Sequence, residues 1–203
     1  MNEIDQNRVQ TKAATIPQSA SQVYASGELE ALFRATFFHS YDTLLEGGAA
    51  EPVYLPGHPH RICYTRDYFR SALHEIAHWC VAGPARRQQE DYGYWYAPDG
   101  RNAIEQSQFL AVEVRPQAFE ALFCAACGHP FRVSLDNLDG DPGDQYRFAD
   151  QVKALAHGLI RGGLPERASL WVRAMEEYYR PAQRSLGARL DAVFPNPQHE
   201  TIT

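Results

Sequence analysis

Three observations predict an α+β domain that is mostly helical, with a small β-sheet packed on one central helix. Hydrophobic residues recur at three- and four-residue intervals over most of the chain, which is typical of amphipathic helices. Two short β-prone runs lie on either side of a segment dense in Pro and Gly. Residues 71–80 contain an H-E-x-x-H motif within a helical period. With 203 residues, 44% of them hydrophobic, the chain can bury one core, so we expect one domain.

The folded domain is expected to span residues 27–195. Residues 1–26 are rich in Gln, Ser, Thr and Asn without a sustained hydrophobic period, which predicts a flexible N-terminal tail. Residues 196–203 show no pattern and are expected to form a flexible C-terminal tail. The hydrophobic runs are too short to cross a membrane, and the first residues lack the regions of a signal peptide, so we expect a cytoplasmic protein without a membrane partner.

The N-terminal half is expected to hold one helix, two strands and the central helix. A helical period starts at Ser26, which can cap it, includes Leu45 and ends at the glycines 47–48. Residues 52–55 and 61–64 are the predicted strands, and a segment of turn-forming residues separates them.

The central helix is expected to be capped by Thr65 or Asp67 and to end at the Gly-Pro pair 83–84. Residues 91–96 follow with the sequence D-Y-G-Y-W-Y, whose alternation and aromatic content predict a strand.

The C-terminal half is predicted to be helical. Residues 101–127 keep a helical period that Pro116 interrupts, so we expect either two helices or one kinked helix there. Another helix is expected over residues 144–161, and a last one begins at Pro165.

The H-E-x-x-H motif predicts a metal site with His74 and His78 as ligands. Residues four apart on a helix lie one turn above each other, so both imidazoles can reach one divalent ion. Glu75 can reach a metal-bound water or the substrate without being a ligand, and we predict a catalytic role for it. The alternative is that both histidines are partly buried structural residues of a core helix.

Two histidines leave the ligand set incomplete, and a carboxylate commonly completes it. The candidates in the helical region downstream are Glu105, Glu113 and Glu120. We favour Glu113 because its sequence neighbours are hydrophobic, and a carboxylate in such company needs a partner. His58 and His60 lie beside prolines on a predicted loop and are expected to be surface histidines.

Composition argues against several other functions. The net charge of -6 argues against a nucleic-acid partner and is compatible with a cationic substrate. No P-loop or dinucleotide-binding motif is present, so we predict no nucleotide cofactor. The four cysteines lie in predicted core segments, which argues against a disulfide framework. For Cys124 and Cys127, core packing explains the spacing better than a redox or metal role, because a single C-x-x-C is a weak zinc signature.

Beyond the motif, the chain contains a series of short blocks in a fixed order. They are H-E-I-A-H-W-C at 74–80, A-R-R at 85–87, Y-G-Y-W-Y at 92–96, P-D-G-R at 98–101, Q-S-Q-F at 106–109, V-E-V-R-P-Q-A at 112–118, L-F-C at 122–124 and D-N-L at 136–138. Together these blocks closely resemble the bacterial elongation factor P hydroxylase family, over about residues 28–179.

The resemblance implies a metal-dependent monooxygenase that hydroxylates the β-lysylated lysine of elongation factor P. It implies a zincin-like metal helix with His74 and His78 as ligands, and Glu113 is the best match for the carboxylate. Fe(II) is the expected metal, because oxygen insertion into an unactivated C–H bond requires a redox metal and dioxygen, although a purified form could carry Zn. No histidine has the H-x-D/E pattern of 2-oxoglutarate oxygenases, so an unidentified external reductant is expected.

The expected substrate, elongation factor P bearing β-lysyl-lysine, presents a long side chain with ammonium groups. Tyr94, Trp95 and Tyr96 are predicted to bind these groups by cation–π contact. Asp91 and Asp99 are predicted to bind them by charge.

Two other classes of function stay open. In a zinc metallopeptidase, Glu75 would deprotonate a zinc-bound water, and residues 92–96 would pair with a peptide as an edge strand. In a non-catalytic protein the metal would be structural and the chain would bind a partner in translation, but structural zinc is usually fully ligated. The variant Glu75→Gln separates them, because a peptidase would lose hydrolysis whereas a structural protein would keep its partner.

Overall fold

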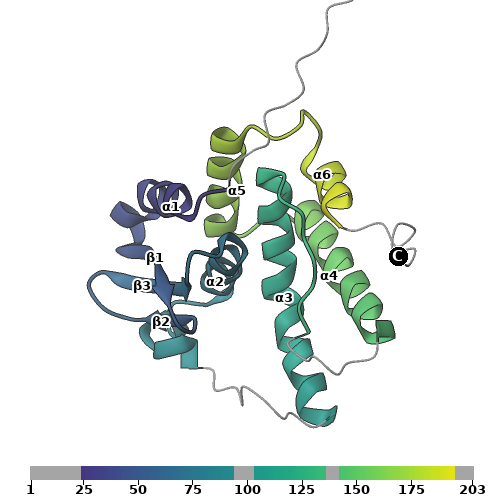
Figure 1. Cartoon of the computed structure of the whole chain (residues 1–203), viewed down its shortest axis with the longest axis horizontal. Coiled ribbons are helices and arrows are strands. Elements are labelled where there is room, and N and C mark those ends of the chain that lie inside the picture. Colours follow the sequence, from purple (N-terminus) through teal and green to yellow (C-terminus); the bar gives the residue numbers. More distant parts are fainter. Residues whose placement is uncertain (1–23, 94–102, 136–141, 195–203) are drawn as a thin grey trace, which may run out of the picture.

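The computed structural model describes residues 24–93, 103–135 and 142–194 (Figure 1). The predicted mostly helical α+β fold is confirmed. The described elements, in chain order, are α1 (Ser26–Tyr41), β1 (Thr43–Ala49), β2 (Val53–Leu55), β3 (His60–Thr65), α2 (Phe69–Val81), the 3-10 turns η1 (Arg86–Gln88) and η2 (Glu90–Gly93), α3 (Ala103–Cys127), α4 (Pro142–Gly162), α5 (Glu166–Tyr179) and α6 (Leu186–Val193). Nearly all of both predicted tails lies outside the described residues.

Helix α3 is the centre of the molecule and packs against α2, α4, α5 and α6 (Figure 1). Its second half, residues 118–127, is buried, including Cys124 and Cys127, as core packing predicts. Residues 103–127 form one helix with Pro116 inside it, so the alternative of two separate helices is wrong. Proline removes the hydrogen bond to the carbonyl four residues earlier, which belongs to Val112, a residue that is 38% exposed.

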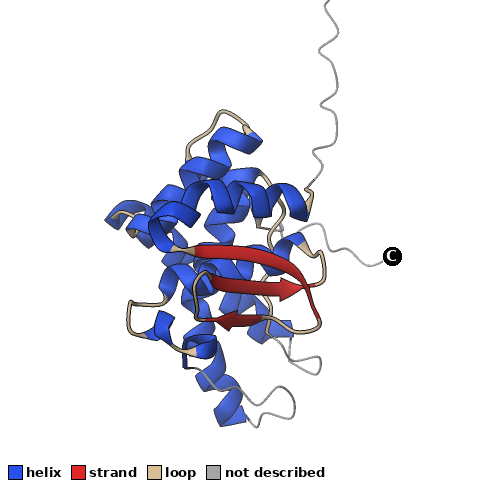
Figure 2. Ribbon diagram, turned by 90° about the vertical axis from the view of Figure 1, so that its left-hand side faces the viewer, coloured by secondary structure: helices blue, strands red, loops and turns tan. Residues whose placement is uncertain are grey.

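The three strands form one small sheet in the order β1-β3-β2. Strand β1 runs parallel to β3, and β2 runs antiparallel to it. Figure 2 shows the sheet as a single layer against the helices. Helix α1 packs on β1 and helix α2 packs on β3, so the sheet supports the helix that carries the motif. Its buried side chains include Leu45, Tyr54, Ile62 and Tyr64.

The first helix is shorter than predicted, because the segment around Leu45 is strand β1. Asp42 ends α1 with a left-handed φ of 46°, and burial then alternates along the start of β1. Gly47 was expected to stop a helix, but it has another role. A Cβ at Gly47 would lie 2.6 Å from the carbonyl oxygen of Arg66, so glycine permits the close approach of β1 to the end of β3.

The start of α2 also differs from the prediction. The helix begins at Phe69, and neither Thr65 nor Asp67 caps it. Arg66 adopts a left-handed φ of 50°, which turns the chain between β3 and α2. The hydroxyl of Ser71 accepts a hydrogen bond from the Thr65 amide and so joins the two elements.

The strand predicted over residues 91–96 is not formed in its described part. Asp91 and Tyr92 have φ values of 45° and 59° and belong to the 3-10 turn η2. The Asp91 carboxylate accepts a hydrogen bond of 2.8 Å from the Tyr54 amide, so this turn is tied to β2. Residues 94–96 lie outside the described residues.

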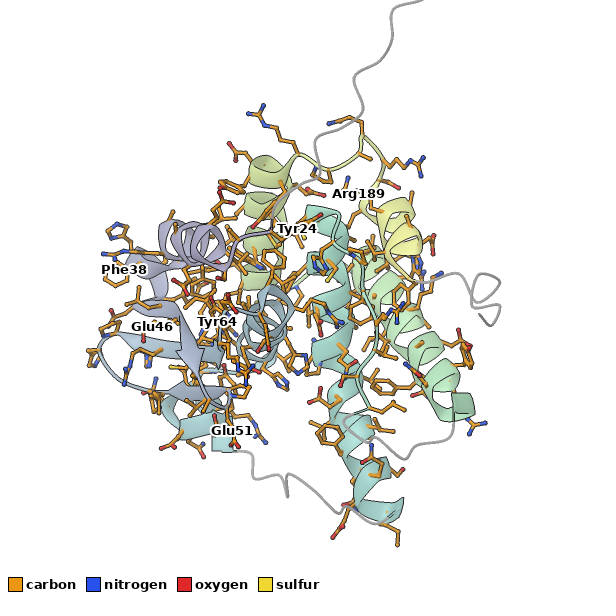
Figure 3. The ribbon with its side chains drawn as sticks, viewed as in Figure 1. Tyr24, Phe38, Glu46, Glu51, Tyr64 and Arg189 are labelled. Carbon is orange, nitrogen blue, oxygen red and sulfur yellow. The ribbon has the colours of Figure 1, made fainter. Side chains whose placement is uncertain are left out.

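Helix α6 was not expected from the sequence. Its N-cap Ser185 accepts a hydrogen bond from the amide of Ala188. Arg189 of α6, labelled in Figure 3, donates to the carbonyl of Ala125 on α3 and pairs with Glu176 on α5. These contacts fix α6 against both helices.

The core beside α2 is built from aromatic rings. Trp79 of α2 and Trp171 of α5 are fully buried, and both contact Phe33 and Phe37 of α1 with centroids 4.9–5.9 Å apart. This cluster packs against the hydrophobic face of α2, which holds the helix and its two histidines in place. Within the described residues, none of the helices has both the length and the hydropathy needed to cross a membrane.

Candidate metal centre

Helix α2 combines a hydrophobic face with a line of polar residues. Arg70, His74 and His78 follow one another at intervals of four and therefore lie along one side of the helix. The buried hydrophobic residues of the same helix are Phe69, Ala72, Leu73, Ile76, Ala77, Trp79 and Cys80. Because these residues face the core, the polar line is turned toward the neighbouring helix α3.

Helix α3 presents a matching polar line to α2. Glu113, Gln117 and Glu120 are at most 3% exposed, and they are three of the four buried polar side chains among the described residues. Their spacing of four and three places them on one face of the helix. Arg70 pairs with Glu120 and His78 with Glu113, so the two helices run antiparallel along this contact.

The side chains of His74, His78 and Glu113 form a group that could hold a metal ion, with ligand atoms within 4.8 Å of one another. The two Nε2 atoms are 3.0 Å apart, and the Glu113 oxygens lie 3.5 Å from His74 Nε2 and 3.4 Å from His78 Nε2. Donors about 2.1 Å from one ion and about 90–110° apart are separated by about 3.0–3.4 Å. The donor spacing therefore fits a single bound cation.

The type and exposure of the donors fit a metal site that is open on one side. Two imidazoles and one carboxylate leave coordination positions free for a substrate or water. The side chain of His74 is 26% exposed and that of His78 is 15% exposed, whereas Glu113 is buried. Small molecules can therefore approach the group from the histidine side.

The two other carboxylates that the sequence left open lie elsewhere. Glu120 lies on the far side of His74, with Oε2 at 2.9 Å from Nδ1. Its Oε1 accepts hydrogen bonds from Nε and Nη2 of Arg70 at 3.1 and 2.6 Å. Glu105 is exposed near the start of α3 and is not part of the group. Of the expected surface histidines, His58 is 92% exposed at its side chain and pairs with an aspartate.

Electrostatics give the two histidines different protonation in the absence of a cation. Burial alone would lower the pKa of His74, but its hydrogen bond with Glu120 and the surrounding carboxylate charges raise it to about 10. Burial and the positive charge of His74 hold the pKa of His78 well below its usual value. A cation bound at both Nε2 atoms must therefore displace a proton from His74.

Glu75 has a pKa that suits proton transfer near neutral pH. Burial, opposed by the charge of His74 and assisted by the charges of Glu113 and Asp91, raises this pKa to about 7. The hydroxyl of Tyr92 is buried without a hydrogen-bond partner among the described residues, and its pKa is raised by burial and by Glu75. A carboxyl group with a pKa near 7 can both accept and donate a proton.

Of the residues predicted to bind substrate, the structure describes Asp91 alone. The charge of Asp91 contributes to the raised pKa of Glu75. One oxygen of Asp91 also accepts the hydrogen bond from the Tyr54 amide of β2. Tyr94, Trp95, Tyr96 and Asp99 lie outside the described residues.

Sequence reasoning missed Arg70 and Gln117, which support the two carboxylates. Gln117 Nε2 lies 3.4 Å from Glu113 Oε2, and the same amide group exchanges two hydrogen bonds with the backbone of Ser134. The signal that could have found them is their spacing, because Arg70 precedes His74 by one turn and Gln117 follows Glu113 by one turn.

Comparison with known proteins finds a family match and a named relative. Residues 32–188 match the family described as elongation factor P hydroxylase. The chain is 42% identical over 156 residues to a Haemophilus influenzae protein named elongation factor P lysine hydroxylase, covering 75% of this chain and 88% of that protein. The family match includes both helices of the candidate metal centre.

Proposed function

Because this chain belongs to the elongation factor P hydroxylase family, we propose that it is a metal-dependent monooxygenase that hydroxylates elongation factor P. The target is the β-lysylated lysine of that protein, and the reaction is a post-translational modification in the cytoplasm. The observation that carries the metal dependence is the converging group of two imidazoles and one buried carboxylate.

His74, His78 and Glu113 would hold the ion, and Fe(II) is the metal we propose. Fe(II) would supply the activation of dioxygen that no side chain can provide. One oxygen atom enters a C–H bond of the substrate, and the other leaves as water with two electrons and two protons. The electrons come from an external reductant, and 2-oxoglutarate is not required.

Glu75 is the residue that we propose handles protons or orients the substrate amine. Its pKa of about 7 and its position on the same helix as both histidines support this role. An ammonium group of the substrate would lie near the carboxylates of Glu75 and Asp91. We retain Tyr94, Trp95, Tyr96 and Asp99 as the proposed remainder of the substrate site.

Intact-mass analysis tests this function directly. β-Lysylated elongation factor P is incubated with the protein, Fe(II), a reductant and air, with and without 2-oxoglutarate. We expect a gain of one oxygen atom, about 16 Da, in both cases, and its loss in His74→Ala, His78→Ala and Glu113→Gln. Glu105→Gln, on the same helix as Glu113 but outside the group, should keep the activity. Iron binding without any mass gain would contradict the proposal.

A zinc metallopeptidase is the second candidate, and one observation favours it. Glu75 follows the first histidine of an H-E-x-x-H motif and has the pKa near 7 that a general base needs. The zinc-loaded protein would then cleave a peptide library, and Glu75→Gln would abolish the cleavage. An absence of cleavage, together with oxygen transfer in the iron form, removes this candidate.

A further inference from the structure

We propose that Glu120 is a positioning residue that fixes the orientation and the tautomer of His74, and that Arg70 in turn holds Glu120. The inference deepens the proposed function and rests on its metal site. It assigns a role to a buried carboxylate and a guanidinium that lie beside the group of possible ligands.

The first step is the contact between Glu120 and His74. Glu120 is 2% exposed, and its Oε2 lies 2.9 Å from Nδ1 of His74. An ionised carboxylate can only accept hydrogen bonds, so Nδ1 must carry the proton and donate it. The other nitrogen, Nε2, is therefore the one that presents its lone pair when an ion displaces its proton, and it faces His78 Nε2 and Glu113.

The second step is the anchoring of Glu120 by Arg70. Arg70 donates to Oε1 of Glu120 from Nε and Nη2, and Nη2 also donates to the carbonyl of Arg132 at 2.7 Å. The guanidinium lies over the ring of Phe131, 5.4 Å from its centroid. Arg70 is therefore itself held in place, and rotation of the Glu120 carboxylate would break both of its hydrogen bonds with Arg70.

The third step explains why this position requires a carboxylate. Both oxygens of Glu120 face N–H donors, Arg70 on one side and His74 on the other. The amide of glutamine has one accepting oxygen and one donating nitrogen, so one of the two donors would meet another donor. The engagement of both oxygens also argues against Glu120 as a metal ligand.

The test measures metal binding separately from activity. Apoprotein variants are titrated with Zn(II) in competition with a chelating dye, and Co(II) spectra are recorded in the visible region. We expect Glu120→Gln to bind Zn(II) about 10–100-fold more weakly than the wild type, because the supporting partner of a metal-bound histidine typically contributes this much. Glu105→Gln is the matched control on the same helix and should bind as the wild type does.

Two further measurements separate positioning from a general loss of structure. Long-range 1H–15N spectra of the zinc-loaded wild type should show the His74 proton on Nδ1. Arg70→Lys keeps the charge but loses the paired donors, so it should weaken binding less than Glu120→Gln and alter the Co(II) spectrum. If Glu120→Gln does not fold, the Zn(II) affinity and Co(II) spectrum of Arg70→Lys and the His74 tautomer of the wild type test the positioning role instead.

The outcomes distinguish this inference from the proposed function. If His74→Ala and His78→Ala bind Zn(II) as tightly as the wild type, the metal site itself is wrong. If those two variants lose binding while the folded Glu120→Gln variant keeps wild-type affinity and spectrum, the positioning role is overturned and the metal site stands. A His74 proton on Nε2 in the zinc form would also overturn it.

Discussion

His74 faces two carboxylates that come from the same helix, and the two have different surroundings. Glu113 lies beside Nε2 together with His78, whereas Glu120 lies beside Nδ1 and is held by Arg70. Both glutamates are buried and lie on one face of α3. The sequence could select the helix and the face, because a seven-residue spacing and hydrophobic neighbours are local signals. Hydrophobic neighbours favoured Glu113 as the ligand, but the different contacts of the two glutamates depend on the register of α2 against α3, which no local signal contains.

The raised pKa of His74 predicts how the affinity for a metal ion depends on pH. Because the pKa of His74 is raised to about 10 in the cation-free protein, Nε2 is protonated at neutral pH and must lose this proton when an ion binds. The affinity should therefore rise with pH, by about tenfold per unit between pH 6.5 and 8 if one proton is released. Zinc titration calorimetry in two buffers of different ionisation enthalpy counts the released protons. Equal heats in both buffers would contradict the prediction.

At the scale of elements, segments with a sustained period or with turn formers on both sides were predictable, whereas the boundary between α1 and β1, the turn η2 and helix α6 were not. The motif helix α2 and the helices α4 and α5 follow from sustained hydrophobic periods, and strands β2 and β3 follow from β-prone runs between turn formers. The boundary between α1 and β1 was missed because Asp42, not a glycine, ends the helix in a left-handed conformation. Residues 91–93 alternate like a strand, but successive left-handed residues turn them into η2.

The edge between β1 and the end of β3 gives a prediction about stability. Gly47→Ala should lower the free energy of unfolding by about 1–3 kcal/mol, because its Cβ would lie 2.6 Å from a backbone oxygen that cannot move freely. Gly158→Ala in α4 is the control, since nothing lies within 4 Å of its Cβ position, and it should raise stability by roughly 0.5–1 kcal/mol. Urea unfolding followed by circular dichroism measures both variants. Equal stability of Gly47→Ala and the wild type would contradict the close approach.

On the scale of the whole molecule, the site joins two parts of the fold. Helix α2 packs on strand β3 of the sheet, and α3 is the centre of the helical part (Figure 1). The aromatic cluster around Trp79 and Trp171 fixes the position of α2. The burial of the second half of α3 fixes the position of α3. The composition predicted a single core. The meeting of the polar lines of α2 and α3 results from tertiary packing, so no local sequence pattern could predict it.

This arrangement predicts that the metal stabilises the whole fold. At a free Zn(II) concentration one hundred times the dissociation constant, binding adds about 2.7 kcal/mol to the free energy of unfolding. For a domain of this size the unfolding temperature should rise by roughly 5–10 °C. Thermal unfolding of chelator-treated protein, with and without added Zn(II), measures the shift, and His74→Ala/His78→Ala provides the control. A shift of equal size in that control would mean that the ion binds elsewhere.

The antiparallel contact of α2 and α3 has a consequence for the chain between them. Glu113 follows His78 by 35 positions, so an ion held by both would act as a reversible cross-link that closes a loop of this length. By the relation used for disulfides, closing a loop of this length costs an open chain on the order of 3–4 kcal/mol of conformational entropy, and the packing of α2 against α3 meets this cost before the ion binds. The loop contains every residue from 91 to 99 that we propose for substrate binding. Loss of the ion would thus remove the cross-link around these residues and the proposed chemistry in a single event.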